Sequence, residues 1–190
     1  MKKWWQQVNR GLLLLALAVL AVSVYLIIDG AKTKKDKVAI KEIAEKFIPE
    51  SSVYLTCPSG FDFWLQDELD KDSLVSSMSA QVKPLESYYC DNEAVRNSQI
   101  DYYFPYFSAC RENQICPVNC TRKALSVDIS EIYNGSATVY VSTQTTVEYK
   151  KEDEALLSEV YTCDEILYFL KQEDGWKLVS VQSNMPYLER

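Results

Sequence analysis

The sequence contains no histidine among its 190 residues. Histidine is the usual general base near neutral pH and the commonest metal ligand in proteins. Its absence excludes hydrolase mechanisms of the Ser/His/Asp and Cys/His kinds within this chain. The cysteines offer no substitute, because no two of them are spaced as C-x-x-C, the arrangement typical of zinc sites and of redox-active dithiols. We therefore expect no enzymatic activity, no bound metal and no cofactor.

Positive charge is scarce as well. The chain has 20 lysines and arginines against 27 aspartates and glutamates, a net charge of −7. Three of the basic residues and one of the acidic residues precede Ala31, so the remainder carries a net charge of −9. Because nucleic-acid binding depends mainly on neutralising phosphates, we expect no nucleic-acid partner. The roughly 160 residues after this point are enough for one domain with its own core.

One long hydrophobic run stands near the N-terminus, LLLLALAVLAVSVYLII at residues 12–28. At about 1.5 Å per helical residue it spans roughly 25 Å, close to the hydrocarbon thickness of a bilayer. A signal peptide cleaved after Ser23 is the alternative, but it would leave the apolar stretch at 24–28 as a new terminus. The run therefore predicts an uncleaved transmembrane signal-anchor at 11–28, after a cytoplasmic segment at 1–10.

The cysteines decide the expected orientation, because lysines and arginines flank the run on both sides in nearly equal number. All six cysteines follow the run, an even number typical of a compartment where disulfides form. We predict structural disulfides, with pairings that the spacing does not determine, and an extracytoplasmic C-terminal domain on a single-pass protein of the cell membrane. The disulfide candidates are Cys57, Cys90, Cys110, Cys116, Cys120 and Cys163.

The extracytoplasmic domain is expected to cover 38–186, after a charged stalk at 29–37. Its first element is an amphipathic helix that ends at Pro49. Apolar residues at intervals of three and four indicate one buried face of that helix. These residues are Ile40, Ile43, Ala44, Phe47 and Ile48.

Residues 50–123 are rich in cysteine and tyrosine, and we predict an irregular half of the domain there. Asp62 is a candidate cap for a helix over 63–74. The aromatic residues have two interpretations: a long loop that packs its rings over the sheet, or a surface that contacts a partner. The residues of this candidate surface are Tyr88, Tyr89, Tyr102, Tyr103, Phe104, Tyr106 and Phe107.

Alternating apolar and polar residues predict an antiparallel meander over 124–183. The first strand alternates Leu125, Val127 and Ile129 with polar residues, and Asn134-Gly135 is a strong two-residue hairpin signal. The second strand should bury one face, formed by Val139, Val141, Thr143, Thr145, Val147 and Tyr149. A third strand at 160–171, a turn at Asp174-Gly175 and a fourth strand at 176–182 complete an α+β domain, with a helix packed on four or more strands.

The closing strand, Gly175-Trp176-Lys177-Leu178-Val179-Ser180-Val181, follows an aspartate. Together with the order of helix, variable segment and long meander, it resembles the nuclear transport factor 2-like (cystatin-like cone) superfamily over about 38–183. The resemblance implies a curved sheet that encloses a helix. Members include enzymes, ligand binders and scaffolds, so the fold alone assigns no activity. Membrane-anchored members resemble inner-membrane scaffold proteins of type IV secretion and conjugation machines, which implies a role in assembly.

Two functional hypotheses follow. The first is a membrane-anchored, extracytoplasmic interaction or scaffold module of the bacterial cell envelope, whose partner is an envelope protein or a second copy of the chain. The second is a small-ligand binder with a pocket between the helix and the concave face of the sheet. The candidate pocket residues are Thr143, Thr145 and Asp164, and the strand register decides which of them point inward.

Overall fold

The computed structural model describes residues 10–58, 70–151 and 155–183. Contacts between α-carbons divide the chain into two compact units, Met1–Val38 and Ala39–Arg190. Helix α1 (Arg10–Glu50) contributes residues to both units, and the stalk expected at 29–37 is helical throughout. Each unit is described below by itself.

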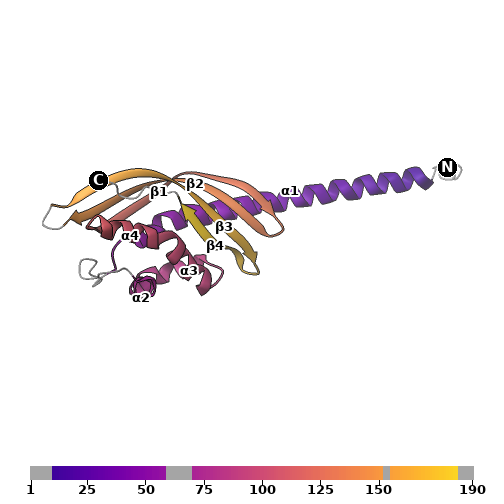
Figure 1. The fold of residues 1–190 in the computed structure, drawn as a ribbon. Helices are drawn as coiled ribbons and strands as arrows, with labels where there is room; N and C mark the ends of the chain where they lie inside the picture. Colours follow the sequence, from indigo (N-terminus) through magenta and orange to yellow (C-terminus); the bar gives the residue numbers. More distant parts are fainter. Residues whose placement is uncertain (1–9, 59–69, 152–154, 184–190) are drawn as a thin grey trace. The chain divides into compact units, whose positions relative to one another are not determined.

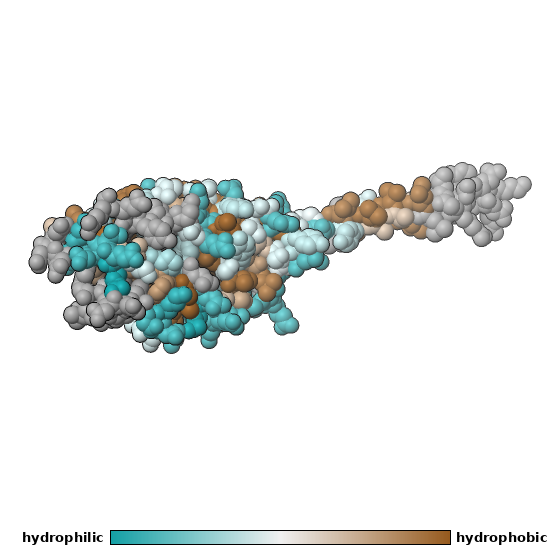
Figure 2. Space-filling view, viewed as in Figure 1, coloured by the Kyte–Doolittle hydropathy of each residue, from teal (hydrophilic) through white to brown (hydrophobic). Residues whose placement is uncertain are grey.

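In the first unit, α1 carries apolar side chains that no other described residue covers. Every residue from 15 to 26 is exposed. Figure 2 shows this stretch as an apolar band. Among the described residues, α1 is the one helix that is long and apolar enough to cross a membrane.

The second unit contains a four-stranded antiparallel sheet in the order β1-β2-β3-β4 (Figure 1). This confirms the meander predicted from the alternating pattern. Asn134 and Gly135 join the first two strands with φ angles of 47° and 76°, the left-handed conformation that a type I′ turn requires. The strands are β1 (Ile115–Tyr133), β2 (Ser136–Lys151), β3 (Leu157–Gln172) and β4 (Gly175–Ser183).

The prediction of an irregular half at 50–123 is wrong for most of the described residues. Short helices fill this region, and β1 begins at Ile115 rather than near residue 124. Local capping explains two of the helices, because Asp70 accepts a hydrogen bond from the Ser73 amide at 2.8 Å and Asp91 from the Ala94 amide at 2.7 Å. The elements are η1 (Ser51–Leu55), α2 (Lys71–Val82), η3 (Lys83–Tyr88), α3 (Asn92–Ser98), η4 (Gln99–Tyr103) and α4 (Phe104–Glu112). The cap at Asp62 and most of the helix expected over 63–74 lie outside the described residues.

The amphipathic stripe at the end of α1 is confirmed. Ile40, Ala44, Phe47 and Ile48 are fully buried in the core of the second unit. The Phe47 ring makes edge-on contacts with the rings of Tyr88 and Tyr89, with centroids 5.5 and 5.9 Å apart. Pro49 lies in the last turn, after which the chain continues as the 3₁₀ helix η1.

Helices α2, α3 and α4 lie on one face of the sheet, which we call the inner face (Figure 1). The face predicted for β2 is buried there, from Val139 to Tyr149 at alternate positions. Strand β1 departs from the expected alternation, because register shifts follow Pro117, Ala124 and Ile129. The second shift turns Leu125 outward, where it is 51% exposed, so its predicted grouping with Val127 and Ile129 is wrong.

Replacing Phe47 by alanine should lower the free energy of unfolding of the second unit by about 3–5 kcal/mol, because it leaves a cavity between the helix and two tyrosine rings. Lys46→Ala, at an exposed position of the same helix, is the matched control. Urea unfolding of the detergent-solubilised chain measures the difference. Equal midpoints for the two variants would contradict the observed packing.

Candidate functional site

A buried ion pair lies at the centre of the inner face. Arg122 of β1 contacts Glu165 of β3, and neither side chain has any exposed surface. Strand β2 runs between these two strands, so the long arginine side chain crosses it to reach the carboxylate. A buried charge is tolerated only when it is paired and hydrogen-bonded, so each side chain depends on the other.

Neighbouring side chains extend this pair into a network that joins five elements. The guanidinium of Arg122 donates to the Ser51 hydroxyl of η1, which donates to the Ile48 carbonyl of α1 at 2.8 Å. On the other side, the Thr143 hydroxyl of β2 lies 3.1 Å from Glu165 Oε1 and 3.3 Å from the Cys163 carbonyl. The network therefore links the end of α1 to three adjacent strands.

The arginine is protonated at neutral pH because its ordinary pKa lies far above 7. Burial lowers the pKa of Arg122, but interaction with Tyr102, Tyr103, Cys120 and Cys163, which ionise only at high pH, outweighs burial and raises it. Burial also raises the pKa of Tyr102 to about 12, so this phenol stays neutral at physiological pH. The site thus holds a fixed cation whose charge the Glu165 carboxylate balances.

Three polar atoms, two of the pair itself and one of a tyrosine beside it, have no hydrogen-bond partner among the described residues. They are Tyr103 Oη, Arg122 Nε and Glu165 Oε2, all buried. Atoms of this kind normally bind an ordered water or another small polar group. Two surface hollows of the second unit, of about 330 and 280 Å³, are lined by other residues. The buried polar groups of the ion pair and its neighbours therefore face one another and line neither of the two hollows.

The structure separates the three candidate pocket residues. Thr143 and Thr145 are fully buried on the inner face, whereas Asp164 is exposed on the opposite face. The choice of Asp164 for a pocket between the helix and the inner face is therefore wrong, and its neighbour Glu165 is the inward carboxylate. The sequence pattern after Glu165 indicates this orientation. Leu167 and Phe169, two and four residues later, are apolar and buried, and residues two apart on a strand point to the same face.

Arg122 was missed for a different reason. The predicted meander began at 124, which left Arg122 in the segment expected to be irregular. Its direct neighbours, Thr121 and Lys123, are both polar, so no apolar alternation marks a buried position there.

Most of the candidate aromatic surface is buried. Tyr89, Tyr102, Tyr103, Tyr106 and Phe107 are at most 8% exposed, and Tyr88 and Phe104 are half-buried. Tyr103 stacks on Tyr54 with ring centroids 4.1 Å apart. All residues of the candidate surface except Tyr89 belong to helices, including the π-helical turn η4, and Tyr89 forms an isolated β-bridge with Leu178. Of the two interpretations, the structure favours rings that pack over the sheet, and the five buried rings are not accessible to a partner.

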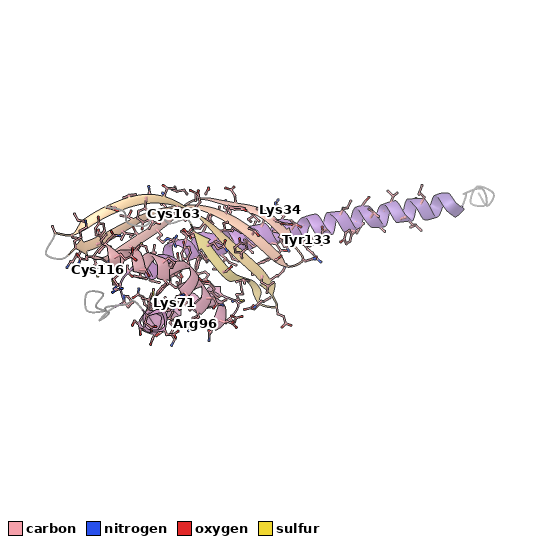
Figure 3. The ribbon with its side chains drawn as sticks, in the orientation of Figure 1. Lys34, Lys71, Arg96, Cys116, Tyr133 and Cys163 are labelled. Atoms are coloured by element: carbon pink, nitrogen blue, oxygen red, sulfur yellow. The ribbon has the colours of Figure 1, made fainter. Side chains whose placement is uncertain are left out.

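No cysteine sulfur of the described residues is bonded to another. Cys57 and Cys116 come closest, with sulfurs 3.1 Å apart. Cys116 lies at the start of β1, and Cys163 lies farther along the sheet on β3 (Figure 3). Cys120 lies on β1, and β2 separates β1 from β3. Cys110 is buried in α4, and Cys90 is half-buried beside Asp91.

The outer face of the sheet is the second candidate site. It is formed by the even-numbered residues 136–146 of β2 and 160–170 of β3, which pair across the strands and point away from the helices. Tyr140, Val160 and Leu170 are 49%, 61% and 42% exposed. Tyr140 and Ile166 also line the hollow of about 330 Å³, together with Asp164, Gln182 and Ser183.

Charge is sparse on the outer face. Asp164 is the one charged residue among these twelve, whereas 25% of the whole chain is charged. Further charges lie beside them on β1, where Lys123, Asp128 and Glu131 pair with Gln144, Tyr140 and Thr138. An antiparallel sheet that faces water usually alternates apolar and charged or polar residues cleanly. Exposed apolar and tyrosine side chains in a charge-poor area are typical of protein-binding surfaces.

No family model and no curated protein matches the sequence. Solved structures resemble the chain in fold. An NTF2-like protein with a cystatin-like fold from Novosphingobium aromaticivorans is 11% identical, with a TM-score of 0.40, and the match covers 83% of this chain and 86% of that one. An IcmL-like type IV secretion system protein from Legionella pneumophila is 12% identical, with a TM-score of 0.38 and coverages of 81% and 96%.

A third similar structure is a nuclear transport factor 2 (NTF2-like) superfamily protein from Salmonella enterica, 18% identical with a TM-score of 0.31. The match covers 39% of this chain and about half, 51%, of the Salmonella protein. The resemblance to the nuclear transport factor 2-like superfamily that the sequence predicts is confirmed at the level of fold.

Breaking the buried pair from one side should cost more than removing it. Glu165→Leu or Arg122→Met leaves an unpaired charged group in the core, and each should lower the free energy of unfolding by about 3–5 kcal/mol. The double variant Arg122→Met/Glu165→Leu should be more stable than either single variant. Chemical denaturation of the four proteins measures the coupling.

The exposed pair of Arg96 with Asp72 is the control (Figure 3). Arg96→Met should change stability by less than about 1 kcal/mol, because solvent screens the pair. Additive effects of the two buried substitutions would contradict a direct interaction between Arg122 and Glu165.

Proposed function

We propose that this protein is a single-pass membrane protein whose extracytoplasmic domain binds a second protein of the cell envelope through the outer face of its sheet. The observation that carries the proposal is the exposed, charge-poor surface around Tyr140, Ile166 and Leu170. Tyrosine suits such a surface because it combines a large apolar ring with a polar tip.

The membrane anchor is supported by the exposure of residues 15–26 on α1. A helix that is apolar on all sides is stable in water only when protein covers it, and no described residue covers this one. A bilayer provides the matching solvent. The even set of six cysteines after this segment supports an oxidising, extracytoplasmic location for the second unit.

Charge favours a heterologous partner over a second copy. The chain after Ala31 carries a net charge of −9, so two copies repel each other as they approach. A fitting partner presents an uncharged, apolar patch rimmed by lysine or arginine, because the rim then pairs with the acidic surroundings of the outer face. The narrower hypothesis of a secretion or conjugation machine is part of this proposal and concerns the identity of that partner.

The interior of the domain favours a binding module without catalysis. Its central charges, Arg122 and Glu165, neutralise each other and have no exposed surface. A substrate would have to displace the helices to reach them. The absence of enzymatic activity is accordingly part of the proposal.

A small-ligand binder is the second candidate, and one observation favours it. Tyr103 Oη, Arg122 Nε and Glu165 Oε2 are buried without partners, as they would be around a polar guest. Binding at this place requires the helices to move away from the inner face, so it would be slow and would stabilise the fold.

A photo-crosslinking amino acid at position 140 should capture one heterologous membrane or envelope protein in intact cells. The same probe at Glu93, an exposed position of α3 on the helical side, is the matched control and should yield no such adduct. Gel mobility and mass spectrometry identify the adduct. Ile166→Asp, beside the probe, should reduce its yield at least several-fold because it replaces an apolar side chain next to position 140 with a charged one.

Adducts between two copies of this chain would refute the heterologous partner. Equal yields from positions 140 and 93, or no adduct from position 140, would refute the outer face as the binding surface.

The full chain should resist extraction from membranes by alkaline carbonate, and Leu20→Arg should move much of it to the soluble fraction. An arginine near the middle of a spanning helix costs about 2.5–3.5 kcal/mol on the insertion scale. Leu20 is 63% exposed, so the substitution disturbs no packing within the protein. A reporter active only outside the cytoplasm, fused after residue 190, should be active in cells that make the unsubstituted chain.

Lys34→Arg, just beyond the apolar stretch, is the control and should leave both readouts unchanged. Activity of a cytosol-dependent reporter alone would refute the orientation, and carbonate extraction of the unsubstituted chain would refute the anchor.

A further inference from the structure

Two cysteines far apart in sequence lie side by side where the helices join the sheet. The sulfur of Cys57, just after η1, is 3.1 Å from the sulfur of Cys116, the second residue of β1. This separation is about 1 Å longer than a disulfide bond. The backbones are also held together, because the Cys57 amide donates to the Pro117 carbonyl at 2.9 Å.

A bond between these sulfurs would enclose the whole helical layer. All of α2, η3, α3, η4 and α4 lies between the two cysteines in sequence. These helices are short, and tertiary packing rather than intrinsic propensity keeps such helices folded. A covalent link across this segment would remove much of the conformational freedom that its unfolded chain has.

The other cysteines are less well placed for a bond. Cys120 and Cys163 lie on β1 and β3, and β2 between them puts those strands about 9–10 Å apart. Their partners on β2 are Val147 and Thr143, which adds an offset of four residues along the strands. The α-carbons of a disulfide are rarely more than about 7 Å apart.

We propose that Cys57 and Cys116 form a structural disulfide that fastens the helical layer to the start of β1, and that Cys110 remains a buried thiol beside it. The bond forms by exchange with a disulfide-bearing oxidant. The thiolate of one cysteine attacks the oxidant and releases one of its thiols, and the second cysteine then attacks the mixed disulfide and releases the other. Two thiols of the protein are thereby oxidised, one disulfide of the oxidant is reduced, and both protons leave with the released thiols.

The surroundings favour a bond that persists after it forms. A hydrogen bond to Cys116 and burial raise the pKa of Cys57, so its sulfur is a poor leaving group in the reverse exchange. Cys110 is the nearest competitor. Cys110 is 1% exposed, whereas Cys57 and Cys116 are partly exposed, so an oxidant in solution has access to those two sulfurs and not to Cys110.

The full chain in detergent, equilibrated with oxidised and reduced glutathione, tests the proposal directly. After alkylation of free thiols and proteolysis without reductant, a peptide that joins Cys57 to Cys116 should appear, while Cys110 should be recovered as a free thiol once the protein is unfolded. Recovery of Cys57 and Cys116 as alkylated thiols under oxidising conditions would overturn the proposal. A peptide that joins Cys57 to Cys110 would overturn this pairing.

Stability supplies a second readout. Reduction should raise the unfolding equilibrium constant of the unsubstituted chain about a thousandfold, as expected for a loop of this length. Cys90→Ser, the matched control, should respond to reductant in the same way, whereas Cys57→Ser and Cys116→Ser should not respond. A reductant effect that persists in Cys57→Ser would overturn the assignment. Because the mapping uses purified protein and a defined oxidant, its outcome is independent of the cellular location proposed above.

Discussion

The buried pair of Arg122 and Glu165 is the constraint on which the rest of the second unit depends. Two charges without solvent are tolerated only while they contact each other, so the strands that carry them must keep one relative register. Ser51 connects this pair to the end of α1, because its hydroxyl accepts a hydrogen bond from Arg122 and donates one to the Ile48 carbonyl. Helix, sheet and connecting turn are thus positioned by one polar network inside an otherwise apolar core.

This network also bears on where the domain can bind a ligand or a partner. In a domain with a curved sheet and a helical layer, the space between them is the natural place for a ligand. Here that space holds a self-neutralised ion pair and the rings of Tyr103 and Tyr106. The outer face, with little charge and exposed tyrosine and aliphatic side chains, is the larger accessible feature. These observations therefore favour the proposed binding at the outer face over a ligand site in the interior.

The parts of the fold that were predictable from sequence are those with a repeated local signal. The hairpin at Asn134-Gly135 has the residues that a type I′ turn requires, and the residues of β2 alternate with the period of a strand. The helices between 71 and 112 lack such redundancy, because they are short and two of them begin at single capping aspartates. The π-helical turn at 99–103, which precedes the buried Tyr106, has no recognisable pattern at all.

The candidate site was harder to predict, because burial of a charge depends on tertiary contacts. Asp164 and Glu165 are adjacent and chemically alike, and a shift of one residue in strand parity exchanges their roles. Arg122 is fully buried although residues of its type are almost always exposed. Aromatic content was equally ambiguous, since buried rings and partner-binding rings have the same composition.

The three register shifts of β1 have a further consequence for the proposed membrane protein. This strand forms one edge of the sheet over 19 residues, and a regular edge of that length is a template for another strand. The shifts after Pro117, Ala124 and Ile129 interrupt the ladder of amide and carbonyl groups at that edge. Confinement to two dimensions raises the frequency of encounters between neighbouring copies. If the chain is anchored as proposed, an interrupted edge would let it accumulate at high density without polymerising strand to strand.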